Sequence, residues 1–143
     1  MNKKSYIKFA NKAASIQINE LKKIKRIFNS SFVEAIELIM NCKGKVIFSG
    51  VGKNSFICKK AAATFSSVGI PSFFVDPTGV SHGDAGQLDK KDILIIISNS
   101  GNTSELINLL KFANRFRIKI VGIASNSNSM LIRASDIKIL YPK

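Results

Sequence analysis

Five short runs of β-branched and aromatic residues constrain the fold more than any other feature of this chain. They are Lys45–Ser49, Ser72–Val75, Ile93–Ile97, Lys119–Ile123 and Asp136–Leu140. Three of them are apolar at both alternating sets of positions, as in strands that helices cover on both faces. Most are separated by segments with helical spacing of apolar residues. This alternation predicts a parallel sheet with right-handed crossovers.

The segments between the runs carry the pattern of amphipathic helices. Apolar residues recur every three or four positions in Asn54–Val68 and Thr103–Arg117, and a shorter helix is expected over Ser127–Ala134. Two more helices precede the first strand, over Ser5–Phe28 and Phe32–Asn41. The expected fold is an α/β domain with a five-stranded, parallel, doubly wound sheet of the flavodoxin-like type and two N-terminal helices.

Length and hydropathy exclude several classes of protein. A chain of 143 residues is the size of one domain with one core. The longest apolar run, Ile93–Ile97, is far shorter than the ~20 residues of a membrane span, so we expect no membrane partner. Lys8, Asn11 and Lys12 interrupt the N-terminal segment where an export signal would be apolar. A cytoplasmic location is therefore expected.

The two cysteines indicate neither a metal site nor a redox motif. Cys42 and Cys58 have neither metal-ligand nor Cys-x-x-Cys spacing. In a cytoplasmic protein reduced thiols are favoured over a disulfide. No metal site is expected.

The net charge of +13 raises the possibility of a nucleic-acid partner. Eight of the 22 basic residues lie in Met1–Asn29, against the single acid Glu20, and no base-reading motif occurs elsewhere. Lys also greatly outnumbers Arg. We therefore expect no nucleic-acid partner, and interpret residues 1–30 as a basic helix that is solvated or faces an acidic partner surface.

Ligands of doubly wound sheets bind beyond the carboxyl ends of the strands. Four loops lie there: residues 50–55, 76–87, 98–105 and 125–129. The first loop matches neither the nucleotide P-loop nor the dinucleotide fingerprint. It predicts a tight glycine turn that brings backbone close to a ligand and presents Lys53, or simply a turn beside a surface lysine.

The third loop, Ser98–Glu105, consists almost wholly of small hydroxyl and amide side chains. With the free N–H groups of the following helix, it predicts an anion site suited to a phosphate monoester. The alternative is a helix cap that Glu105 completes in the first turn.

Two residues in these loops are candidates for acid–base chemistry. Glu105 is a candidate general base for a C–H next to a carbonyl, or else a partner of the helix dipole. His82, the single histidine, lies in a polar loop rather than on an apolar face.

Four motifs, taken in their order and spacing, resemble a known family. They are GVGKN at 50–54, AAATFSSVGIPSFFVDP at 61–77, SHGDAGQ at 81–87 and ISNSGNTSE at 97–105. Over about Phe32–Leu140 the chain resembles the sugar isomerase (SIS) domain, and most of all the D-arabinose-5-phosphate isomerases of Gram-negative bacteria. The resemblance implies interconversion of D-ribulose 5-phosphate and D-arabinose 5-phosphate for the Kdo sugar of lipopolysaccharide, without an organic cofactor.

The resemblance implies a role for each candidate residue. Lys53 matches the catalytic lysine, a cation suited to the charge of an enediolate. Glu105 matches a carboxylate implicated in activity, and His82 matches the histidine of the loop after the second strand. The substrate-binding residues are Gly52, Asn54, Ser98, Asn99, Ser100 and Thr103. The family usually has Ser in place of Asn54, so we expect weakened but retained binding there.

Family members continue past the fifth strand with a further Glu and His tied to catalysis, and then usually with paired cystathionine-β-synthase-type domains. We therefore expect residues 31–143 to be one C-terminally incomplete SIS domain. We expect a homo-oligomer, because the helix that normally covers the sheet is missing. We also expect the chain to bind a pentose 5-phosphate even if it no longer converts it.

Two alternatives to an isomerase stay open. One is a non-catalytic phosphosugar-binding SIS module. The other is an inactive gene remnant, which the composition and the early stop favour.

Overall fold

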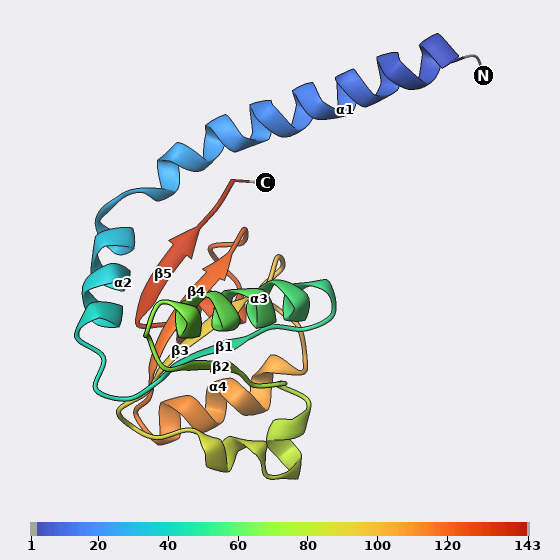
Figure 1. Ribbon diagram of the computed structural model, residues 1–143. Helices are drawn as coiled ribbons and strands as arrows, with labels where there is room; N and C mark the ends of the chain where they lie inside the picture. Colours follow the sequence, from blue (N-terminus) through green and yellow to red (C-terminus); the bar gives the residue numbers. More distant parts are fainter. Residues whose placement is uncertain (1–2, 143) are drawn as a thin grey trace.

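The computed structural model describes residues 3–142 and contains a five-stranded sheet with helices on both faces (Figure 1). All strand pairs are parallel, and the strand order is β2-β1-β3-β4-β5. The strands are β1 (Val46–Ser49), β2 (Ser72–Phe74), β3 (Ile93–Ile97), β4 (Lys119–Ala124) and β5 (Ile137–Leu140). This confirms the expected doubly wound, flavodoxin-like sheet, with every strand end within one residue of its predicted position.

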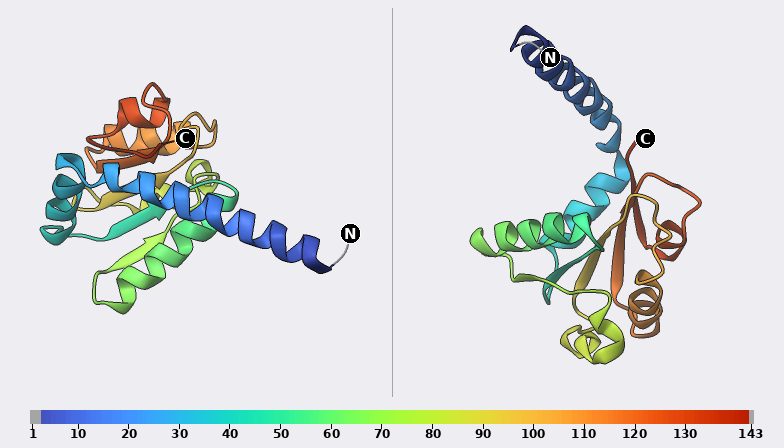
Figure 2. Two further views of the ribbon diagram at one scale, coloured as in Figure 1. Left: turned by 90° about the horizontal axis from the view of Figure 1, so that it is seen from above. Right: turned by 90° about the vertical axis from the view of Figure 1, so that its right-hand side faces the viewer.

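The helices form two layers, one on each face of the sheet. On one face α2 (Ser30–Met40) packs on β5, and α3 (Lys53–Ser67) packs on β1 and β2. On the other face lie α4 (Leu106–Arg115) and α5 (Met130–Ala134), and Figure 2 shows the sheet between the layers. Two short 3₁₀ helices, η2 (Gly79–His82) and η3 (Asp84–Gln87), form the connection between β2 and β3.

Two helices start later than the sequence pattern predicts. The expected helix over Thr103–Arg117 begins only at Leu106, because residues 104 and 105 form a separate turn in which Thr103 C=O accepts from Leu106 N–H at 3.1 Å. The expected helix from Ser127 begins at Met130, because Ser129 is its N-cap. In both cases Ser and Thr side chains make local bonds that compete with helix.

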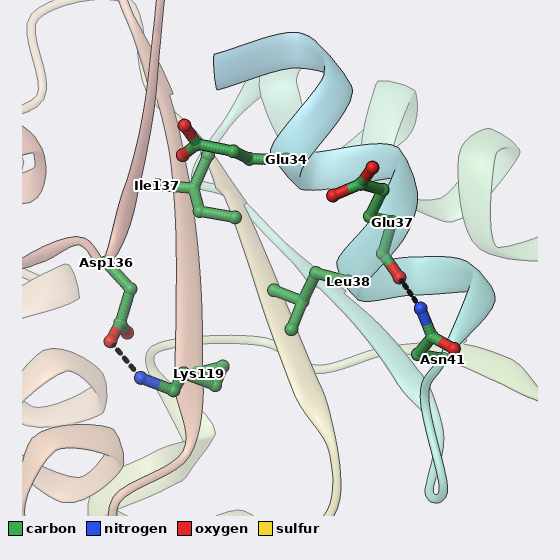
Figure 3. A pocket seen from close by; sticks show the side chains of 7 residues that line it. All are labelled: Glu34, Glu37, Leu38, Asn41, Lys119, Asp136 and Ile137. Atoms are coloured by element: carbon green, nitrogen blue, oxygen red, sulfur yellow. Dashed lines mark hydrogen bonds and ion pairs between the residues drawn. The ribbon is translucent and has the colours of Figure 1, made fainter. Parts of the chain in front are cut away.

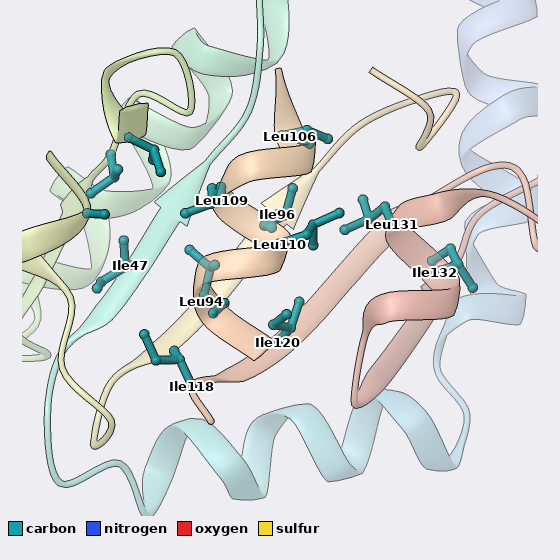
Figure 4. Packing of buried hydrophobic residues seen from close by; sticks show 14 of the residues in the cluster. Ile47, Leu94, Ile96, Leu106, Leu109, Leu110, Ile118, Ile120, Leu131 and Ile132 are labelled. Carbon is teal, nitrogen blue, oxygen red and sulfur yellow. The ribbon is translucent and has the colours of Figure 1, made fainter. Parts of the chain in front are cut away.

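Each face of the sheet has its own apolar core. On the face of α4 and α5, side chains from the central strands interdigitate with the helices (Figure 4); they include Ile47, Leu94, Ile96, Ile120, Leu106, Leu109 and Leu131, all fully buried. The alternate strand residues, among them Val46, Phe48 and Val121, face α2 and α3. Burial on both faces explains why these strands are continuously apolar in sequence.

Two aspartates anchor the amino ends of the strands. Asp92 is buried and accepts from the N–H groups of Lys45 at 2.7 Å and Asp89 at 2.8 Å. Asp136 accepts from Ile120 N–H at 2.9 Å and from the ammonium of Lys119 at 2.7 Å. Burial raises the pKa of Asp136, but these donors outweigh it and hold the pKa below its usual value. The two carboxylates thus link β1 to β3 and β4 to β5.

The N-terminal helix α1 (Lys3–Lys23) and the following turn η1 (Ile24–Ile27) replace the single predicted helix over Ser5–Phe28. No residue of α1 is buried, and the helix projects away from the sheet (Figures 1 and 2). In the part of the chain that the structure describes, no helix has the length and apolarity needed to cross a bilayer.

Truncating a central core residue tests this packing. Ile120→Ala removes a fully buried side chain from β4 and leaves a cavity, so we expect the free energy of unfolding to fall by about 2–5 kcal/mol. Urea unfolding followed by circular dichroism measures the change. The matched control is Lys111→Ala, on the exposed side of α4, with an expected change of about 0.5 kcal/mol or less. Equal effects of the two substitutions would contradict the core described here.

Candidate functional site at the carboxyl ends of the strands

The sheet has one point where the direction of strand order reverses. From β1 the chain crosses to β2 on one side, and from β3 it crosses to β4 on the other, while β1 and β3 are paired neighbours. Ser49 pairs with Ile96, so the loops that follow these two strands leave the sheet side by side. A crevice at this point is where such folds bind ligands. The Lys53 loop and the hydroxyl loop, here defined as residues 98–105, thus leave the sheet next to each other at the point where such a crevice is expected.

Backbone packing at this point is tight. A Cβ at Gly50 would lie 3.0 Å from Ile97 C=O and 3.1 Å from the sulfur of Cys58. Cys58 is fully buried below the turn and its thiol donates to Ser49 C=O at 3.2 Å. Burial raises the pKa of the Cys58 thiol to about 11, so it stays protonated. Cys42 and Cys58 are both free thiols, as expected.

The turn after β1 presents Lys53 at the first position of α3. Gly52 has φ +61°, a left-handed conformation that favours glycine, and a Cβ there would meet open space. Ser55 donates from its hydroxyl to Gly52 C=O at 2.7 Å, which closes the turn. Lys53 is exposed, and its ammonium has no ion-pair partner among residues 3–142. Asn54, next along the helix, is half-buried.

Within the hydroxyl loop, Ser98 has a structural position. Its side chain is buried, accepts from Gly101 N–H at 3.1 Å, and lies 3.1 Å from the hydroxyl oxygen of Thr103. Ser100 is exposed and accepts from Asn102 N–H at 3.3 Å. The hydroxyl groups therefore hold one another in a fixed loop, and the half-buried Thr103 and exposed Ser100 form its accessible part.

Residues outside the loop brace it from behind. Ser125 donates from its hydroxyl to Asn99 C=O at 2.8 Å, and the N–H of Leu131 donates to Gly101 C=O at 2.9 Å. The loop after β4, which the sequence analysis placed among the ligand loops, thus makes structural bonds to the hydroxyl loop. Gly101 has φ +68°, and a Cβ there would overlap the Ser129 side chain.

Two bracing residues were missed from the sequence. The side chain of Asn102 accepts from Met130 N–H at 2.8 Å, which ties the loop to the start of α5. The hydroxyl of Tyr141 donates to the side-chain oxygen of Asn99 at 2.9 Å. Asn102 lies inside the ISNSGNTSE motif, which could have identified it as a residue that holds the loop. Tyr141 lies in no motif, so nothing in the sequence singles it out.

The capping alternative placed Glu105 in the first turn of the helix, and the structure corrects this. Glu105 is the residue before α4, in helical conformation, and its side chain makes no cap bond. Its carboxylate accepts from the Ser104 hydroxyl at 2.9 Å. Its own backbone N–H and this hydroxyl lower the pKa of Glu105, which is fully exposed to solvent. A lowered pKa makes a carboxylate a weaker proton acceptor.

His82 is exposed at the end of η2. Its loop is held against the hydroxyl-loop side of the molecule, because Asn108 of α4 donates to the Ser81 hydroxyl at 2.8 Å. Val80 packs in the same buried cluster as Leu106. The described contacts thus bring the His82 loop to α4, but they join His82 directly to neither Lys53 nor Glu105.

A hollow elsewhere in the molecule contains none of the predicted site residues. Figure 3 shows this groove of about 440 Å³ between α2 and the start of β5, lined by Glu34, Glu37, Leu38, Asn41, Lys119, Asp136 and Ile137. We assign the candidate site to the switch point instead. The groove contains neither the lysine nor the hydroxyl side chains that the sequence analysis identified as candidates for binding and catalysis. Within residues 3–142, no three His, Cys, Asp or Glu side chains gather as metal ligands would.

The strand order, with polar loops at its switch point, defines a doubly wound α/β domain. Residues 38–143 match the SIS domain, and the chain belongs to this family. Arabinose 5-phosphate isomerase KdsD of Francisella tularensis is 41% identical over 138 residues, which are 94% of this chain and 42% of that protein. An uncharacterized protein of Rickettsia prowazekii is 36% identical over 143 residues, 45% of its own length.

Solved structures agree with this assignment. A structure from E. coli CFT073, in complex with arabinose 5-phosphate, superposes with a TM-score of 0.87 at 36% identity, covering 99% of this chain and 76% of that one. A putative sugar-phosphate isomerase of Listeria monocytogenes superposes with a TM-score of 0.85 at 29% identity, covering 99% and 74%. The chain spans less than half the length of the curated relatives named above.

Gly101→Ala tests whether the hydroxyl loop is built as described. The substitution places a Cβ against Ser129 and strains a positive φ, so we expect a loss of about 1–3 kcal/mol in the free energy of unfolding. Gly86→Ala is the matched control, since Gly86 has open space around it and no positive φ. Thermal and urea unfolding compare the two. A Gly101 variant as stable as the Gly86 variant would contradict the close contact between the loop and Ser129.

Proposed function

We propose that this SIS domain binds a pentose 5-phosphate and interconverts D-arabinose 5-phosphate and D-ribulose 5-phosphate. The observation that carries the proposal is the pairing of β1 with β3, because the lysine turn and the hydrogen-bonded hydroxyl loop leave the sheet from the adjacent ends of these two strands. The arabinose 5-phosphate isomerases among its relatives, and the sugar-phosphate complex of its structural neighbour, support this choice of sugar.

In this proposal the phosphate lies on the hydroxyl loop. Ser100 and Thr103 offer hydroxyls, and Ser98 and Asn99 hold their neighbours in place. Backbone N–H groups of the loop add donors, as at other anion sites. Recognition by neutral donors suits a monoester on a small sugar. Gly52 and Asn54 are proposed to approach the sugar from the opposite side of the crevice.

The chemical step that we propose is a proton transfer between two neighbouring carbons of the open-chain sugar. A base removes the proton from C2 of the aldose, and the electron pair forms a C1–C2 enediolate with the negative charge on O1. A proton passes from O2 to O1, and reprotonation at C1 gives the ketose. Each proton that leaves one atom of the sugar is replaced on its neighbour, so the step consumes neither an oxidant nor a cofactor. Lys53 stabilises the negative oxygen of the enediolate. Glu105 and His82 are the proposed proton carriers.

The exposure and the lowered pKa of Glu105 favour a second candidate function: a module that binds a phosphosugar and converts it slowly or not at all. Both properties reduce the strength of the Glu105 carboxylate as a base. We therefore expect the chain to bind its ligand better than it converts it. If the chain is an isomerase, its resemblance to the family implies a cytoplasmic location. The same resemblance implies that its product is used to make the Kdo sugar of lipopolysaccharide.

Ser100→Ala tests phosphate binding. Arabinose 5-phosphate should raise the melting temperature of the unmodified chain, and the variant should show a smaller shift, because an exposed hydroxyl of the loop is lost. Ser67→Ala, at the far end of α3, is the control and should keep the full shift. Calorimetric titration gives the dissociation constants, with at least a several-fold weakening expected for Ser100→Ala. No binding by the folded, unmodified chain would exclude both candidate functions.

Lys53→Met separates binding from chemistry. Loss of a positioned charge-stabilising group typically lowers the rate by ~10² to 10⁴, so we expect turnover to fall to background while titration still detects the sugar phosphate. Lys60→Met, an exposed lysine two turns along α3, should leave whatever activity the chain has unchanged. A Lys53 variant with full activity would remove the lysine from the mechanism. Absence of turnover in the unmodified chain, with binding intact, would favour the binding module.

A further inference from the structure

Tyr141 follows β5 directly and reaches the hydroxyl loop across the end of β4. Its backbone N–H donates to the C=O of Ala124, the last residue of β4, at 3.2 Å. Its side-chain hydroxyl donates to the side-chain oxygen of Asn99 at 2.9 Å. Because β4 lies between β3 and β5 in the sheet (Figure 1), this one residue links the edge strand to the loop that follows the central strand β3.

Asn99 is held at its backbone and at its side chain. Its C=O accepts from the backbone N–H of Ser125 at 3.1 Å and from the Ser125 hydroxyl at 2.8 Å. Its side-chain oxygen accepts from Tyr141. Asn99 is exposed, so without these partners its side chain would keep its rotational freedom. The three bonds together fix the peptide group between Asn99 and Ser100 in one orientation.

This orientation determines where the N–H of Ser100 points. In a trans peptide the C=O of one residue and the N–H of the next point in opposite directions. The C=O of Asn99 points to the loop after β4, so the N–H of Ser100 points to the other side of the hydroxyl loop. On that side the neighbour of β3 is β1, whose loop carries Lys53. Within residues 3–142 no group accepts from the Ser100 N–H, which leaves it available to a ligand.

The hydroxyl of Tyr141 is a stable donor. Tyr141 is half-buried, and burial raises its pKa, so the hydroxyl keeps its proton at neutral pH. Phenylalanine in its place would preserve the ring and remove only the donor. The bond to Asn99 can therefore be tested without deleting the packing of the side chain.

We propose that Tyr141 is a positioning residue for phosphate binding, which acts through Asn99 to hold the Ser100 N–H toward the phosphate. The inference rests on the proposed function, because it concerns the same phosphate site. It extends that site to the end of β5, which none of the four ligand loops includes. Tyr141 donates to Asn99 rather than to the ligand. Its contribution is to orient the peptide before binding, which lowers the ordering cost of the bound state.

Tyr141→Phe tests the proposal by calorimetric titration with arabinose 5-phosphate. Loss of one positioning hydrogen bond should raise the dissociation constant about three- to tenfold. Tyr6→Phe is the matched control, because it makes the same chemical change on α1, where Tyr6 is 59% exposed, and it should bind as the unmodified chain does. Circular dichroism and thermal unfolding confirm that both variants are folded.

The amide signals of the loop give a readout that a merely structural role would not move. In ¹H–¹⁵N spectra at saturating arabinose 5-phosphate, the Ser100 amide proton should move downfield in the unmodified chain and by less in Tyr141→Phe. The Gly101 N–H already donates to the Ser98 hydroxyl, so its signal should respond less than that of Ser100 in both proteins.

Asn99→Ala and the double variant test the path of the effect. If Tyr141 acts through Asn99, adding Tyr141→Phe to Asn99→Ala should weaken binding no further. The proposal is overturned if Tyr141→Phe binds as tightly as Tyr6→Phe, if the effects of the two substitutions multiply, or if the Ser100 amide does not respond to the ligand. An unaffected Tyr141→Phe in a chain that binds the sugar removes only the role of Tyr141. No binding by the folded, unmodified chain overturns the proposed function, and this inference with it.

Discussion

The packing of β1 against β3 determines where the functional groups of this protein lie. The two strands are neighbours in the middle of the sheet, and at their carboxyl ends Gly50 leaves no room for a side chain next to Ile97 and Cys58. The backbones therefore separate into two loops from almost the same place. One loop leads to Lys53 at the start of α3, and the other is the hydroxyl loop. A Cβ at position 50 would contact Ile97, Asn54 and Cys58 at 3.0–3.1 Å, so a side chain there would force a shift where the two loops leave the sheet.

The hydroxyl loop is held in shape by its own hydrogen bonds and by its neighbours. Ser98 is buried inside it, and Asn102 and Gly101 join it to α5. A loop held by its own bonds would lose little conformational freedom on binding the proposed phosphate. The same bonds involve several of the small polar side chains that the sequence analysis took as ligand contacts. Among the hydroxyls proposed to bind the ligand, Ser100 is exposed and Thr103 is half-buried, whereas Ser98 is buried.

Sequence reasoning worked best where one physical cause dominates. Strands buried on both faces must be apolar throughout, so β1, β3 and β4 could be located to within a residue. The glycines at 50 and 52 pointed to a tight turn, in which Gly52 has φ +61°. Features that depend on tertiary contacts could not be predicted. The burial of Ser98, the bond from Tyr141 to Asn99, and the late start of α4 after Glu105 each require knowledge of which loops meet.

The structure also makes some candidate residues better suited to catalysis than others. Lys53 is an exposed cation at the start of α3 without an ion-pair partner in the described part of the chain, whereas Glu105 is a solvated carboxylate with a lowered pKa. A helix over Ser5–Phe28 was expected, but the exposure of its large apolar side chains could be seen only in the structure. Charge alone suggested a basic helix that is solvated or faces an acidic partner surface.

A crystal structure of the chain with arabinose 5-phosphate tests the central claim most directly. The account predicts the phosphate within hydrogen-bond distance of the hydroxyls of Ser100 and Thr103, with the Lys53 ammonium close to C1 and C2 of the sugar. The main competitor for an anion is the groove of about 230 Å³ at the other end of the sheet, whose lining includes Lys43, Lys90 and Lys91. A sugar phosphate bound in that groove, with the hydroxyl loop empty, would contradict the assignment of the site.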